Sequence, residues 1–180
     1  MITIIQATNR TDSNTELISR HVYDFIKSIY HDQVSYVSMK DLPPEIIHAD
    51  PYEEMNMPDA LKMIQDKWMI PAEKFIWICP EYNGSYPGIV KLFIDALSVR
   101  YYAETFAFKK SALIGVTKGR SGNIRGLDHL ADVLIFMKSV IYPRLLPISR
   151  VNDLLDENGL IIHTPTLAVI DDHIRGFLSF

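Results

Sequence analysis

Apolar residues fall in short blocks along this chain, and the blocks have two different spacings. Nearly continuous apolar runs at 2–7, 34–37, 75–79, 111–116 and 141–148 predict five buried strands. Between and after them, apolar residues recur every three or four positions and predict helices at 17–29, 60–69, 89–99 and 166–178, with a further helix that ends near 139. Strands and helices are therefore expected to alternate from the start of the chain.

This alternation predicts a parallel sheet whose two faces are covered by right-handed crossover helices. The strands are apolar throughout rather than at every second position, which is typical of strands buried on both faces. Five strands fit the flavodoxin-like order 2-1-3-4-5, so the predicted fold is an α/β three-layer sandwich. Pro143 and Pro147 suit a place for the last strand at the edge of the sheet. At 180 residues, a single domain over 1–180 is expected.

The segment 40–58 is long, acidic and proline-bearing, and it predicts a surface loop. Its length exceeds that of ordinary connections, which indicates a functional edge or an oligomer contact.

In the predicted architecture, the loops after the first, third and fourth strands meet at the carboxyl edge of the sheet, where ligands bind. The first of them, 8–15, is dense in hydroxyl and amide side chains and leads into a helix N-terminus, whose free N–H groups favour a phosphate. Arg10 can grip a phosphate through two parallel hydrogen bonds, and Asp12 is expected to point away from it. Helix capping by Ser13 or Asn14 explains the same residues equally well without a ligand.

The loop after the third strand, 80–88, is the most informative segment of the chain. Two prolines restrict it, two glycines allow the backbone to approach a ligand closely, and two tyrosines offer flat faces for stacking. Backbone N–H groups at 83–85 are expected to hydrogen-bond the polar atoms of a ring. Tyr82 and Tyr86 either line a pocket for an electron acceptor or pack against a neighbouring subunit.

The loop after the fourth strand, 117–123, contains two glycines and is expected to close over the other edge of the ring. The alternative is an ordinary turn from strand to helix, in which Lys118 and Arg120 are solvated surface charges.

Composition excludes several classes of function. The net charge of −4 comes from interspersed charges, so no basic stripe for nucleic acid is present. No stretch approaches the roughly 20 apolar residues of a membrane span, and the apolar start is too short for a signal peptide. The single cysteine, Cys79, lies in a strand pattern and is expected to be a core residue. A soluble cytoplasmic protein is the simplest expectation.

Other catalytic signatures are missing. The six histidines are scattered, and none forms a metal-binding pair. The cluster 171–173, Asp-Asp-His, is expected to be polar helix surface rather than a metal site. The chain lacks the nucleotide P-loop, the Gly-x-Gly-x-x-Gly motif and the Gly-x-Ser-x-Gly of a hydrolase.

The stretch Pro-Glu-Tyr-Asn-Gly-Ser-x-Pro-Gly at 80–88 resembles the flavin-ring loop of the NADPH-dependent FMN reductase family, and 91–97 is similar to the helix that follows it. The first loop resembles the family's phosphate loop, with Ala7-Thr8 where Gly-Ser is common. The fourth loop has Arg120-Ser121-Gly122 where Gly-Gly is frequent. We expect cofactor contacts from Thr8, Arg10, Ser13, Asn14, Thr15, Pro80, Glu81, Tyr82, Asn83, Gly84, Ser85, Thr117, Gly119, Arg120 and Gly122.

The resemblance implies bound FMN, reduction by NADPH or NADH, and transfer of electrons to a small acceptor such as a flavin, quinone, azo compound or metal oxyanion. It also implies a homodimer or tetramer. The flavin carries the chemistry, so no catalytic side chain and no metal are expected, and the kinetics should be ping-pong. The alternatives are a flavodoxin-type electron carrier, against which the mild net charge argues, and a flavin-free interaction module.

Overall fold

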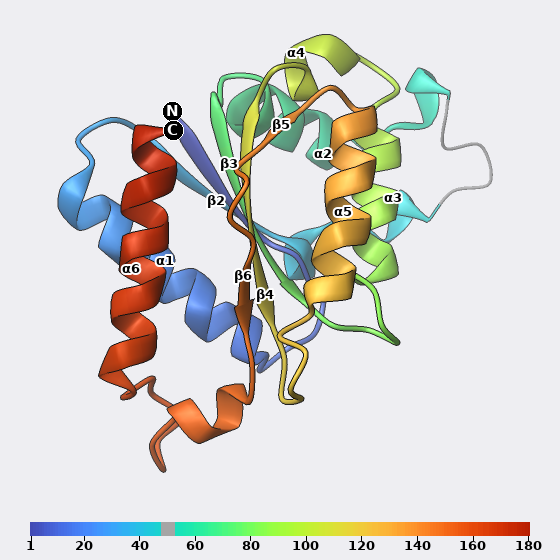
Figure 1. The fold of residues 1–180 in the computed structure, drawn as a ribbon. Helices are drawn as coiled ribbons and strands as arrows, with labels where there is room; N and C mark the ends of the chain where they lie inside the picture. The colour runs from blue at the N-terminus through green and yellow to red at the C-terminus, as the bar shows by residue number, and fades with distance from the viewer. Residues whose placement is uncertain (48–52) are drawn as a thin grey trace.

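The computed structural model describes residues 1–47 and 53–180, and a parallel sheet runs through the middle of the part described (Figure 1). Its strands are β1 Ile2–Gln6, β2 Val34–Ser38, β3 Lys74–Pro80, β4 Lys110–Val116, β5 Val140–Ile141 and β6 Leu146–Ile148. The strand order is β2-β1-β3-β4-β5, and β6 also pairs with β4. The predicted flavodoxin-like order is therefore confirmed, with one strand more than expected.

The additional strand comes from the segment that was predicted as one strand over 141–148. Its two ends pair separately with β4, with Ile141 opposite Ser111 and Leu146 opposite Ile114. Pro143 lies between the two strands and has no N–H group to continue the ladder. The prediction of one continuous strand was wrong, but its place at the edge of the sheet was right.

Helices cover both faces of the sheet, which confirms the three-layer arrangement (Figure 1). One layer consists of α1 Asn14–Ile29 and α6 Thr164–Ser179. The other consists of α2 Asp59–Ile64, α3 Gly88–Leu97 and α5 Ile124–Phe136. A short helix that the sequence pattern did not predict, α4 Tyr102–Phe106, follows α3.

The predicted helix over 60–69 differs from the observed one from Gln65 onward. After α2 the backbone continues as a π-helical turn over Gln65–Met69. The buried side-chain amide of Gln65 donates to the carbonyl of Leu97 at 2.9 Å and lies 2.8 Å from the hydroxyl of Thr105. The widened turn thus ties α2 to the end of α3 and to α4.

The segment 40–58 is only partly a surface loop. Short 3₁₀ turns form at Met39–Asp41, Pro44–Ile46 and Glu54–Asn56. Ile46 and Met57 are buried against the core, and residues 48–52 of this prediction lie outside the described residues.

Two apolar cores flank the sheet. Trp77 of β3 and Phe93 of α3 belong to one, and Ile4 of β1 and Ile18 of α1 belong to the other. Cys79 is fully buried, as expected for a core residue, and burial raises the pKa of its thiol far above the usual range. Among the helices in the described ranges, none has both the length and the apolar character needed to cross a bilayer.

Candidate functional site

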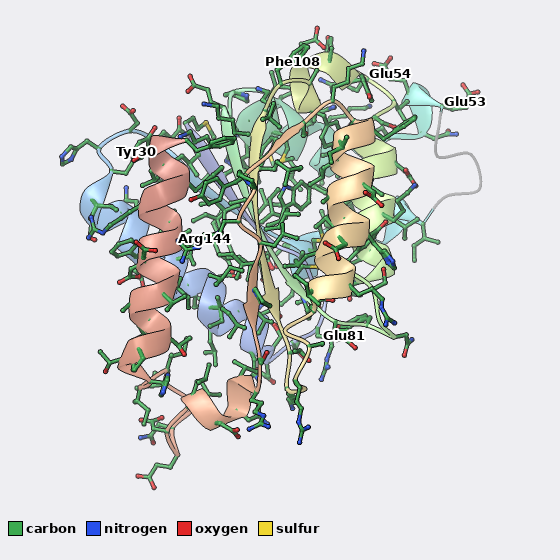
Figure 2. All side chains as sticks on the ribbon, viewed as in Figure 1. Tyr30, Glu53, Glu54, Glu81, Phe108 and Arg144 are labelled. Atoms are coloured by element: carbon green, nitrogen blue, oxygen red, sulfur yellow. The ribbon has the colours of Figure 1, made fainter. Side chains whose placement is uncertain are left out.

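A cleft of about 230 Å³ opens between the loops that follow β1, β3 and β4. Because parallel strands end at the same edge, these loops converge at one end of the sheet. Figure 2 shows Glu81 at this end and Phe108 at the opposite end. The cleft is lined by Thr8, Arg10, Asp12, Ser13, Asn14, Thr15, Pro80, Glu81, Tyr82, Val116, Thr117, Lys118 and Val151.

The first loop brings donor groups to the cleft at the start of α1. Ser13 caps the helix, because its hydroxyl accepts a hydrogen bond from the N–H of Glu16 at 3.2 Å. Within the described ranges, the N–H groups of Asn14 and Thr15 have no hydrogen-bond partner. Capping and ligand binding are therefore compatible, since Ser13 satisfies one amide of the first turn and leaves two others for an anion.

The electrostatics of this end suit an anion in spite of the acidic side chain in the first turn of α1. Glu16 accepts hydrogen bonds from Lys40 at 2.8 Å and from Arg20 at 2.7 Å. These two bonds, that from Lys40 first, hold the pKa of the Glu16 carboxyl below its usual range. Its negative charge is thus paired on the flank of the helix rather than directed at the cleft.

The loop after β3 contains a tight turn at Asn83 and Gly84. Both residues have positive φ, 51° and 79°, as a type I′ turn requires. The turn is closed by hydrogen bonds from Tyr82 N–H to Ser85 O at 2.8 Å and from Ser85 N–H to Tyr82 O at 3.1 Å. The N–H of Ser85 is therefore engaged inside the turn, contrary to the expectation that it would contact a ring.

Tyr82 joins two of the loops. Its hydroxyl lies 2.9 Å from the hydroxyl of the fully buried Thr8, so the first loop and the loop after β3 are linked across the cleft. The cleft lining includes Tyr82, whereas Tyr86 is half-buried against the core on the α3 side. Burial raises the pKa of Tyr86.

Several residues predicted at the site do not line the cleft. They are Asn83, Gly84, Ser85, Gly119, Arg120 and Gly122. The Ser85 hydroxyl lies 3.0 Å from His129 Nδ1, so the tip of its loop packs against α5.

The predicted residues of the fourth loop are held by the segment after β6. Gly119 O accepts from Arg150 N–H at 2.8 Å, and Arg120 O accepts from the Ser149 hydroxyl at 2.8 Å. Gly122 packs tightly on Pro147, with no room for a Cβ atom. These contacts tie the backbone of the loop to the neighbouring segment at 147–150.

Four lining residues were missed or misplaced by sequence reasoning. Asp12, which was expected to point away from the phosphate, is among the residues that line the cleft. Val116 is the last residue of β4, and Lys118 follows two residues later, so the position of the fourth loop could have suggested both. Val151 gives no such signal, because it follows β6 in a different part of the sequence. Its N–H donates to Thr117 O at 3.0 Å.

The histidines that the structure describes form no metal centre. Among the described residues, no group of three or more His, Cys, Asp or Glu side chains could hold an ion. In the cluster 171–173, Asp171 pairs with His21 and Asp172 pairs with Arg144. His173 is fully buried, so the expectation of a polar surface cluster was wrong for this residue.

Comparison with known proteins agrees with this architecture. The family model described as NADPH-dependent FMN reductase matches residues 1–153. The NAD(P)H-dependent FMN reductase PA1204 of Pseudomonas aeruginosa is 24% identical over 142 residues, which are 77% of this chain and 75% of that protein. The quinone reductase of Escherichia coli strain K12 is 28% identical over 144 residues, 79% of this chain and 72% of that one.

Solved structures share the fold. The flavoenzyme NAD(P)H:(acceptor) oxidoreductase FerB of Paracoccus denitrificans superposes with a TM-score of 0.79 at 20% identity, covering 99% of this chain and 94% of that one. With the family model spanning β1 to the segment after β6, the chain belongs to the NADPH-dependent FMN reductase family, whose members are oxidoreductases that use FMN and NAD(P)H.

Proposed function

We propose that this protein binds FMN in the cleft formed by the loops after β1, β3 and β4, and that it passes electrons from NAD(P)H to a small acceptor such as a quinone, a flavin or an azo compound. The observation that carries the proposal is the convergence of donor groups from the first loop with the loop that follows β3. Thr8, Arg10 and Tyr82 all line one cleft at the carboxyl edge of the sheet.

The residues of the first loop fit a phosphate group. The unpaired N–H groups of Asn14 and Thr15 lie at the positive end of the α1 dipole. Arg10 adds a charge that can donate two hydrogen bonds to phosphate oxygens. Lys118 and Arg10 offset the carboxylates of Asp12 and Glu81 in the lining.

The residues after β3 fit a flat ring. Pro80, Glu81 and Tyr82 form one wall of the cleft, and Val116 and Val151 add apolar surface. In the described part of the chain, the N–H groups of Asn83 and Gly84 have no partner and are available at the tip of the turn. Thr117 lines the same cleft, so the lining residues would cover one face of a bound ring with backbone and apolar side chains.

When bound, FMN supplies the chemistry, by taking a hydride from NAD(P)H and giving electrons to the acceptor. The chain's own residues bind the phosphate, orient the ring and leave one face open to substrates. Because a single open face serves both substrates in turn, ping-pong kinetics are expected. A rate law that requires both substrates to be bound together would contradict this order.

The first experiment is an absorption spectrum of the purified protein, before and after adding NADPH without oxygen. We expect a flavin spectrum that bleaches within the mixing time. A flavin that neither NADPH nor NADH bleaches would favour a flavodoxin-type carrier. A protein that retains no flavin after incubation with FMN would contradict the cofactor site.

Replacement of Arg10 with alanine should weaken FMN binding by about 2 kcal/mol, or about thirtyfold, because a charged hydrogen bond to phosphate is lost. Titration of FMN fluorescence with the FMN-free protein measures the effect. Arg20→Ala is the matched control, since Arg20 lies on the exposed flank of α1 and pairs with Glu16 outside the cleft. Equal affinities of the two variants would remove Arg10 from the site.

We also infer a homodimer or tetramer located in the cytoplasm, with the chain acting as one domain. Large apolar side chains on and near α5 support self-association, because Phe108 and Phe136 are 79% and 81% exposed. Light scattering gives the number of subunits, and activity that persists unchanged in a verified monomer would exclude a site shared between subunits.

A further inference from the structure

Asn123 is a buried residue outside the cleft that contacts the start of the loop after β3. It precedes α5, is 1% exposed and adopts a left-handed conformation with φ 64° and ψ 26°. Its side-chain amide donates to Cys79 O at 3.1 Å and to Pro80 O at 2.9 Å. One side chain thus binds two successive carbonyl groups at the end of β3.

These bonds fix the orientation of the backbone that forms the cleft wall. In a trans peptide, the carbonyl of one residue and the N–H of the next point in opposite directions. When Asn123 holds the carbonyl of Pro80, the N–H of Glu81 is directed to the other side of the chain. Pro80 and Glu81 both line the cleft, so the orientation of this peptide shapes the wall against which the ring would lie.

A second connection reinforces the first. The hydroxyl of Ser121 accepts a hydrogen bond from Asn123 N–H at 3.2 Å and donates one to the carboxylate of Glu81. The loop between β4 and α5 therefore holds residue 81 through its side chain and, through Asn123, the backbone just before it.

The fit around Asn123 leaves its side chain little freedom. A Cβ atom at Gly126 would lie 2.1 Å from Asn123 Oδ1 and 2.8 Å from the carbonyl carbon of Ser85. Within the described residues, Asn123 Oδ1 is buried without a hydrogen-bond partner. Both this unpaired oxygen and the positive φ are unfavourable. Glycine would adopt this backbone conformation more easily. What asparagine contributes at this position is therefore its side-chain amide, which donates the two hydrogen bonds.

We infer that Asn123 is a positioning residue, which holds the loop at 80–88 in its cofactor-binding conformation before FMN arrives. The inference rests on the proposed function for the role of the loop, but the contact itself is independent of FMN. A preformed wall reduces the ordering that binding would otherwise require.

Asn123→Gly tests this inference, because glycine keeps the left-handed backbone and removes the side chain with its amide. In the FMN-free protein, hydrogen exchange of the bonded amides within 81–85, those of Tyr82 and Ser85, should become about tenfold faster. The dissociation constant of FMN should rise about tenfold, as expected for the loss of two buried hydrogen bonds. Asn123→Asp should act in the same direction, since it preserves the shape but cannot donate. Ile124→Ala is the matched control, because Ile124 is the next residue and is 40% exposed.

The outcomes separate the two proposals. If the exchange rates at 81–85 and the affinity for FMN are both the same in Asn123→Gly as in the wild type, the positioning role is refuted. If the wild type does not bind FMN, the proposed function fails, and hydrogen exchange in the FMN-free variants still decides whether Asn123 holds the loop. A thermal midpoint that falls equally in Asn123→Gly and Ile124→Ala, without faster exchange at 81–85, would indicate a merely structural role and overturn the inference.

Discussion

Gly115→Ala should lower the free energy of unfolding by about 3 kcal/mol, because the new methyl group has no space. A Cβ atom at Gly115, in β4, would lie 2.1 Å from the carbonyl oxygen of Gly122. The loop cannot retreat easily, since Gly122 is itself packed against Pro147 of β6. Movement of the loop would also carry Asn123 away from Cys79 and Pro80, so FMN affinity should fall as well.

The midpoint of urea unfolding, compared at equal m-values, measures the change in stability. Gly88→Ala is the matched control, because a Cβ atom at Gly88 meets nothing within 4 Å. At the first residue of α3, alanine should be neutral or stabilising by about 0.5 kcal/mol. If both variants unfold at the same urea concentration, the close approach of β4 and the loop has no energetic importance.

The second large effect is a loss of stability in acid caused by His173. This side chain of α6 is fully buried, and its ring lies 5.3 Å from that of Tyr142 in an edge-on arrangement. In the described part of the chain, neither ring nitrogen has a hydrogen-bond partner. Burial, and secondarily the positive charge of Arg144, lowers the pKa of His173 from 6.5 to about 4, against a small opposite effect of Asp172.

Because the pKa of the folded state is the lower one, the unfolded chain binds the proton first as the pH falls. Above pH 6.5 the imidazole is neutral in both the folded and the unfolded chain, so it does not affect the free energy of unfolding. As the pH falls from 6.5 to about 4, the unfolded chain is protonated first and the stability of the fold decreases progressively. A depression of this size corresponds to about 3 kcal/mol over the whole window.

His173→Leu should abolish this component, since leucine fills a similar volume without titrating. The difference in unfolding free energy between His173→Leu and the wild type should grow by about 3 kcal/mol between pH 7 and pH 4. Because the carboxylates titrate in both proteins, their contribution to the unfolding free energy cancels in this difference. A difference that stays constant over this range would show that His173 is not kept neutral by its surroundings.

The loop after β3 shows why part of the site was predictable. Asn83 and Gly84 have the positive φ angles that this pair of residues favours, and the apolar strand before them ends at Pro80. Such signals are local in the chain. For the same reason Thr8 and Thr117 were correctly expected at the edge of the sheet, since each follows a strand pattern directly.

The tip of the fourth loop shows the limit of this reasoning. Gly119 and Arg120 do not line the cleft, and their carbonyl groups bind the segment at 149–150, so their contact with the ring stays a prediction. The segment at 149–150 is distant from the fourth loop in the sequence. The sequence does not show which of the loops at the carboxyl edge it will contact. No pattern within 117–123 distinguishes a loop that closes over a ligand from one that packs on a neighbouring segment.

The sequence by itself determined the alternation of strands and helices, the strand order and the three polar loops, because burial periodicity and turn chemistry are properties of neighbouring residues. Only the tertiary structure decided that Val151 lines the cleft, that His173 faces the core, and that Asn123 holds a strand end 44 residues away. These features depend on which distant segments pack together, and the type of a residue does not identify the residue that it will contact.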